Sequence, residues 1–156
     1  MSSFQLTGIE HEPFEPFFEL TDAELAAQGI VRSIADSHPG FPCRVSLEDA
    51  AVGEELLLLH YLHHPVGSPY RASGPIYIRR GQTRRVLAPG VVPDYVTLRI
   101  ISLRAYDSEH MMRAAHVSEG TGVAGVLERL FTDPAVAYIH LHNAKQGCFS
   151  CLARRA

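Results

Sequence analysis

The sequence predicts an α+β fold, in which a mainly antiparallel sheet carries one or two helices packed on a face. Three observations favour this class. Segments with strand-like patterning outnumber helical ones, most connections between them are too short to hold a crossover helix, and no repeat or linker divides the chain. We therefore expect one globular domain over residues 1–156, a length that can bury a core of its own.

Two helices are predicted by their end signals and periodicity. Thr21 and Glu24 have the spacing of a capping box, in which the threonine hydroxyl accepts from a first-turn amide and the glutamate reaches back. Gly29 lies where a helix C-terminus favours a left-handed residue. A longer helix is predicted over residues 120–131, because apolar side chains recur on one stripe before Pro134 ends it.

The strands are predicted from apolar runs bounded by glycine, proline or polar turns. The longest run, residues 55–63, lies between Gly53 and Pro65, and it is far shorter than the roughly 20 residues needed to span a bilayer. The other expected strands cover residues 4–9, 30–35, 74–80, 96–106, 135–142 and 148–153. We also expect a helical stretch at 13–20, a single helical turn at 46–50 capped by Ser46, and a loop at 87–94.

Composition restricts the compartment and the partners. The formal net charge of −3 gives no electrostatic reason to expect a nucleic-acid or membrane partner. Three cysteines are too few, and of the wrong parity, for a disulfide framework. The first 20 residues contain four glutamates and no lysine or arginine, unlike a secretory signal. These features predict a cytoplasmic protein and leave a homo-oligomer open.

Histidine supplies the first candidate site, since the chain has nine. His140 and His142 are two apart in a predicted strand and therefore share a face. Such a pair can hold one metal ion, with a third ligand from His63, Cys43 or Cys148 in a zinc-type set. The alternative is that these histidines are half-exposed strand residues hydrogen-bonded to their neighbours.

The cysteines supply a second set of candidates. Cys148 and Cys151 form a CxxC pattern, but in a strand they would point to opposite faces, which favours buried, inert thiols over a redox pair or a zinc knuckle. Considered singly, Cys43 beside Arg44 or Cys148 after a glycine could be a nucleophile, with a histidine as general base. The catalytic candidates are therefore Cys43, His140, His142 and Cys148.

A proline-framed loop over residues 69–75 is a candidate binding element. It presents Tyr70 and Arg71 between two predicted strands, and loops on a rigid sheet often carry binding groups. Together with Arg44 on another proline-framed loop, Arg71 would suit a carboxylate or phosphate. The alternative is a loop tied down by its own hydrogen bonds.

One glycine pattern does not predict the dinucleotide cofactor that it resembles. Residues 120–125 match the GxGxxG spacing of a dinucleotide-binding turn and open a helix. The polar segment 113–119 before it is unlike a buried parallel strand, and no acid follows the next strand at 142–143 to hold a ribose. We therefore expect no dinucleotide cofactor.

Three motifs in one order carry a family resemblance: residues 39–47, residues 69–76, and residues 138–144 followed by Gly147 and Cys148. They resemble a small bacterial family catalogued as domain of unknown function 1203, over about residues 4–154. The resemblance implies a bacterial, single-domain, cytosolic protein and implies no activity. The matching positions are Cys43, Arg44, His63, Tyr70, Arg71, His140, His142, Asn143 and Cys148.

The leading functional hypothesis is a polar pocket that binds a small anionic ligand, with Arg44 and Arg71 as charge partners. Its hydrogen-bonding groups would be Tyr70, His140, His142 and Asn143. A second hypothesis is a zinc-type metal protein that uses the three histidines named above and a cysteine. A third is a non-catalytic protein-interaction module whose polar motifs are structural turns. The sequence leaves open whether the protein is an enzyme.

Overall fold

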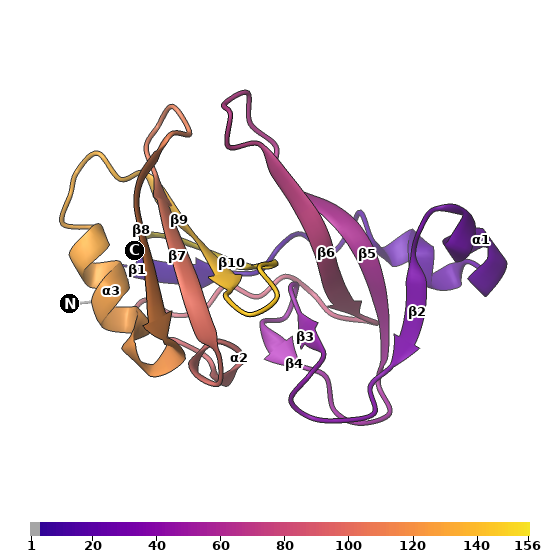
Figure 1. Cartoon of the computed structure of the whole chain (residues 1–156). Helices are drawn as coiled ribbons and strands as arrows, with labels where there is room; N and C mark the ends of the chain where they lie inside the picture. The colour runs from indigo at the N-terminus through magenta and orange to yellow at the C-terminus, as the bar shows by residue number, and fades with distance from the viewer. Residues whose placement is uncertain (1–3) are drawn as a thin grey trace.

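Two five-stranded sheets dominate the computed structural model, which describes residues 4–156 (Figure 1). Sheet A has the order β1-β10-β9-β7-β8, with bounds Phe4–Thr7, Phe149–Arg155, Tyr138–Asn143, Ile100–Tyr106 and Met112–Glu119. Sheet B has the order β2-β5-β6-β3-β4, with bounds Val31–Ile34, Glu55–His64, Ala72–Arg79, Pro42–Cys43 and Glu48–Asp49. All neighbours are antiparallel except β3 and β6. The expected α+β class is therefore confirmed, with the strands divided between two sheets.

The helical elements are short. They are η1 (Glu15–Glu19), α1 (Asp22–Ala27), α2 (Asp94–Thr97), η2 (Gly120–Gly122) and α3 (Val123–Leu130). The expected capping box is confirmed at α1, where Glu24 N–H donates to Thr21 and Thr21 N–H donates to Glu24. Gly29 has the left-handed φ of 73°. No helix within residues 4–156 is both long enough and apolar enough to cross a membrane.

The main core lies between α3 and sheet A. The helix buries the stripe that its sequence predicts, and Figure 1 shows it beside this sheet. Ile139 and Leu141 of β9 face this core and have no exposed surface. Because side chains alternate along a strand, the histidines of β9 point the other way, toward sheet B.

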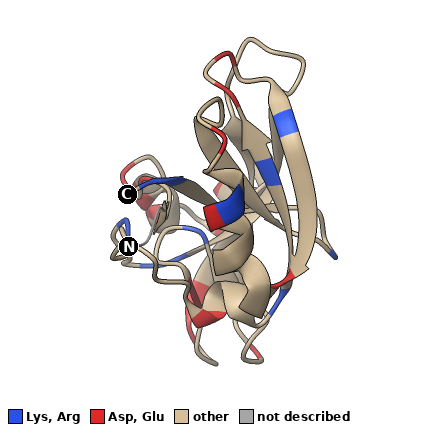
Figure 2. Ribbon diagram, turned by 90° about the vertical axis from the view of Figure 1, so that its left-hand side faces the viewer, with Lys and Arg blue, Asp and Glu red and all other residues tan. Residues whose placement is uncertain are grey.

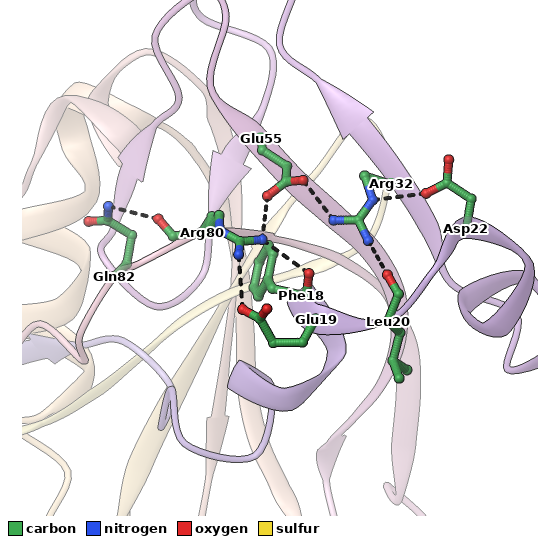
Figure 3. Close-up of polar contacts among 8 residues, drawn as sticks. All are labelled: Phe18, Glu19, Leu20, Asp22, Arg32, Glu55, Arg80 and Gln82. Atoms are coloured by element: carbon green, nitrogen blue, oxygen red, sulfur yellow. Dashed lines mark hydrogen bonds and ion pairs between the residues drawn. The ribbon is translucent and has the colours of Figure 1, made fainter.

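Sheet B has its own smaller core and an ion-pair network at its edge. Leu25 of α1 and Phe18 of η1 pack against the apolar side chains of β5 and β6. Glu55 accepts from Arg32 Nη1 at 2.6 Å and from Arg80 Nη1 at 2.9 Å, as Figure 3 shows. The same two guanidinium groups donate to backbone carbonyls at the end of η1, so the network fastens the N-terminal helices to this sheet.

Two sequence expectations were wrong in detail, and one strand was not predicted. Residues 46–50 do not form a helical turn: residues 44–47 are a tight turn, with Leu47 at φ 54°, and β4 follows. The Ser46 hydroxyl accepts from Arg79 instead of capping a helix. The strand expected from residue 96 starts at Ile100, after α2. Residues 113–119, which the sequence distinguished from a buried parallel strand, belong to the exposed antiparallel edge strand β8. Mixed polar and apolar sequence at these positions reflects edges and turns, which periodicity describes poorly.

Candidate functional site

Three histidines meet between the two sheets. His63 belongs to β5 of sheet B, whereas His140 and His142 belong to β9 of sheet A. Their ligand nitrogens all lie within 4.8 Å of one another. His140 is 5% exposed and His142 is 1% exposed. We refer to these residues as the histidine cluster.

A bulge in β5 lets this strand contribute. Tyr61 pairs with Gly74 and His64 pairs with Ala72, so β5 advances by three residues over a stretch in which β6 advances by two. An extra residue of this kind bends a strand and redirects its side chains. As a result, the adjacent His63 and His64 both approach β9, with ring centroids 5.9 Å and 4.8 Å from that of His140.

Burial keeps the histidine cluster neutral. It lowers the pKa of His63 to about 4, with smaller contributions from His64 and Arg104. It lowers the pKa of His140 to about 2 and that of His142 to about 4, for the same main reason. Arg104 is the cross-strand partner of His140, so its positive charge lies on the same face. All three imidazoles therefore carry a free lone pair at neutral pH.

Each ring of the histidine cluster has one buried nitrogen without a hydrogen-bond partner in the described part of the chain. These atoms are His63 Nδ1, His140 Nδ1 and His142 Nε2. His142 Nδ1 lies 3.0 Å from the Gly147 carbonyl oxygen, and it must donate because a carbonyl only accepts. The proton of the neutral ring is thus on Nδ1, which leaves the Nε2 lone pair inside the protein. A backbone acceptor of this kind fixes the tautomer of metal-binding histidines.

A pocket of about 180 Å³ opens beside the histidine cluster. His63 and His140 line it, together with Tyr61 and the ion pair of Glu10 with Arg84, whose closest atoms are 3.0 Å apart. The Phe149 ring stacks on His63 at a centroid distance of 5.2 Å. A small molecule in this pocket would therefore reach two of the three imidazoles.

A hydrogen-bonded chain of aromatic residues lies next to the histidine cluster. His64 Nδ1 donates to the Tyr70 carbonyl at 2.8 Å, so its Nε2 accepts from the Tyr138 hydroxyl at 2.6 Å. His110 Nδ1 donates to the same hydroxyl at 2.7 Å. Both nitrogens of His64 are engaged, which explains why it is not part of the cluster. The sequence marks Tyr138 as a neighbour of the histidine pair and places His64 in a histidine-rich run at residues 60–64, but it gives no role to His64 and no signal for His110.

A second cleft, of about 270 Å³, lies at the start of β10. Arg44, Asn143 and Cys148 line it with Gln146, Arg99 and several apolar side chains. Although Arg44 is only 1% exposed, all its nitrogens have partners: Nε donates to the Phe149 carbonyl, Nη1 to the Pro42 carbonyl and Nη2 to Cys148 Sγ at 2.9 Å. We refer to this cleft as the Arg44 cleft.

The remaining predicted residues lie elsewhere. Arg71 is exposed, donates weakly to the Val66 carbonyl, and does not line the Arg44 cleft. The Tyr70 ring packs against Tyr106, 5.9 Å between centroids. Cys43 is fully buried and its sulfur accepts from the backbone of β6. Cys151 is in the main core, where burial raises its pKa to about 12.

The fold and site define a two-sheet α+β protein with a buried histidine cluster where the sheets meet. A family model described as "Protein of unknown function (DUF1203)" matches residues 40–155, and the chain belongs to this family. The matched region contains the histidine cluster and the Arg44 cleft. No curated protein and no solved structure matches the chain.

Proposed function

We propose that this protein binds a transition-metal ion of the zinc type through the histidine cluster, His63, His140 and His142. One observation carries the proposal: three neutral imidazoles from two sheets place their ligand nitrogens within 4.8 Å of one another, and each has a buried nitrogen with no partner. Leaving such atoms unsatisfied is costly, and a metal ion would satisfy all three at once.

The spacing is compatible with this ion. Zinc binds imidazole nitrogen at about 2.0–2.1 Å in tetrahedral geometry, which places two ligand nitrogens about 3.3 Å apart. The cluster would need to contract by at most about 1.5 Å per pair, a shift within reach of small ring rotations. Imidazole also suits copper, iron and nickel, so zinc is the first ion to test.

The fourth position would face the pocket beside the histidine cluster. Within residues 4–156 no cysteine, aspartate or glutamate joins the group of ligand atoms, which leaves three protein ligands. Three ligands and an open position characterise catalytic zinc sites, where the ion activates a bound water. Because Arg104 adds positive charge, an anion such as hydroxide or a carboxylate would be the favoured fourth ligand.

A small anionic ligand at Arg44 is the second candidate. It is favoured by the buried guanidinium and by Asn143 in the same cleft. Arg71, the other expected charge partner, is not among the side chains that line this cleft. A cytoplasmic, bacterial setting also belongs to the proposal, supported by three unpaired cysteines and the resemblance of the motifs.

A calorimetric zinc titration of chelator-treated, untagged protein tests the proposal. We expect one zinc ion per chain in the parent and an affinity at least about 100-fold lower in His140→Ala and in His142→Ala. The matched control is His116→Ala, which removes an exposed histidine of β8 and should leave the affinity unchanged. Parent protein that binds no zinc, or cluster variants that bind it as well as the parent, would refute the metal site.

A further inference from the structure

Arg44 is a buried cation that forms no ion pair with a carboxylate within residues 4–156. Its side chain is among the largest fully buried ones, and its donors reach two backbone carbonyls and one sulfur. Other arginines form ion pairs with acidic side chains, as Arg32, Arg79, Arg80, Arg84, Arg85, Arg99 and Arg113 do. Figure 2 shows basic and acidic residues near one another along the ribbon in several places. A buried charge normally requires a partner of opposite sign.

Two ionisable groups that interact with Arg44, the Tyr95 phenol and the Cys151 thiol, do not supply this negative charge. Burial raises the pKa of Tyr95 far above its ordinary range and that of Cys151 to about 12, so both are neutral. Cys148 Sγ, by contrast, accepts a hydrogen bond from Arg44 Nη2 at 2.9 Å and lies at the cleft surface, half-buried. A guanidinium at this distance stabilises negative charge on sulfur.

We propose that Cys148, whose sulfur accepts a hydrogen bond from Arg44, is a nucleophilic site for small electrophiles that enter the Arg44 cleft. This site is distinct from the histidine cluster and does not rest on metal binding. The sulfur faces a cleft of about 270 Å³, whereas the other two cysteines have no exposed surface.

A second observation points to a ligand in the same cleft. Asn143 lines it, is only 3% exposed, and has an Oδ1 atom without a hydrogen-bond partner. The β9–β10 turn holds this residue beside the cysteine, since Asn143 N–H donates to the Cys148 carbonyl at 2.9 Å. Leu58, Pro75 and Ile76 form an apolar wall. The groups that line the Arg44 cleft fit an electrophile that has an N–H or O–H donor for Asn143 and a small apolar part that contacts the apolar wall.

Iodoacetamide has these features and serves as the probe. The Cys148 thiol gives its proton to the buffer and its sulfur attacks the methylene carbon. An S–C bond forms, the C–I bond breaks, and iodide leaves with the bonding electron pair. No oxidant or reductant is required. The amide N–H₂ group of the probe can donate to Asn143 Oδ1.

The test compares second-order alkylation rates at pH 7, with the modified residue identified by mass spectrometry. We expect Cys148 in the parent to react about tenfold faster than a cysteine in an unstructured peptide, because the Arg44 guanidinium stabilises negative charge on the attacking sulfur. Cys148→Ser should abolish labelling of the folded protein. Arg44→Lys should keep much of the enhancement, and Arg44→Met should remove it.

The parent rate alone is decisive if Arg44→Met does not fold. A parent rate equal to or below that of the peptide would overturn the proposal. So would a finding that added zinc blocks alkylation while Cys148→Ser loses zinc, because Cys148 would then be the fourth ligand of the metal. That result would leave the proposed metal function intact, whereas loss of zinc binding in the histidine variants alone would leave the proposal for Cys148 untouched.

Discussion

At the scale of single residues, neighbouring groups determine the state of the histidine cluster. The Gly147 carbonyl accepts from His142 Nδ1, so the lone pair of that ring is on Nε2, which is buried without a hydrogen-bond partner. The Tyr70 carbonyl and the Tyr138 hydroxyl use both nitrogens of His64, which separates it from the cluster. Burial then disfavours protonation of the remaining rings. The result is a set of lone pairs available at neutral pH.

The lowered pKa values predict acid sensitivity of the metal-free protein. Since the folded-state values of about 4, 2 and 4 lie below the unfolded value of about 6.5, the unfolded chain binds more protons between these limits. The contribution of these neutral histidines to the free energy of unfolding is therefore fully present well above pH 6.5, and it declines as the pH falls toward 4. Urea unfolding should show that the free energy of unfolding falls by up to about 2 kcal/mol per histidine between pH 7.5 and pH 5. The decline should be shallower in His140→Gln and unchanged in the control His116→Ala; parallel curves for all three proteins would contradict this explanation.

At the scale of secondary structure, the segment that leads into α3 explains a misleading sequence pattern. The GxGxxG spacing at residues 120–125 has a packing explanation at its first glycine. A Cβ on Gly120 would lie 2.1 Å from the Val96 carbonyl oxygen and 2.6 Å from that of Arg99. The glycine thus allows η2 to press against the end of α2. Gly125 has open space, since its nearest atom is the end of the Arg129 side chain at 3.7 Å.

Two matched substitutions test this packing role. Gly120→Ala should lower the free energy of unfolding by about 3 kcal/mol or more, because backbone atoms on α2 must move. Gly125→Ala should raise it by about 0.5–1 kcal/mol, since alanine is the better helix former in the middle of α3. Chemical denaturation measures the free energy of unfolding of both variants and of the parent. Equal changes in the free energy of unfolding for the two substitutions would show that the backbone contact at Gly120 does not exclude a side chain there.

The sequence predicts those parts of the site that follow from local periodicity. His140 and His142 are on one face because a strand alternates, and the long apolar run of β5 is recognisable from its bounding glycine and proline. The bulge that adds His63 and His64 depends on pairing with β6, which no local pattern encodes. The same is true of the turn at residues 44–47, which buries Arg44 against β10. The positions of His63, His64 and Arg44 therefore depend on long-range strand pairing, which local sequence patterns do not predict.

At the scale of the whole molecule, the site depends on how the two sheets meet. Sheet B contributes His63 and sheet A contributes His140 and His142, so an ion bound by all three would link the sheets. The hairpin tips that rise side by side in Figure 1 are also joined, because Ser68 Oγ donates to the His110 carbonyl at 2.8 Å. The fold therefore holds the ligands in place before any ion binds, as a preorganised metal site requires.

The most direct test of the metal site is elemental analysis of untagged protein purified without chelators. The account predicts near-stoichiometric zinc in the parent and in His116→Ala, and only background metal in His142→Ala, whose missing ring carries the best-defined lone pair. Background metal in the parent, or undiminished zinc in His142→Ala, would contradict the assignment of the histidine cluster as a metal site.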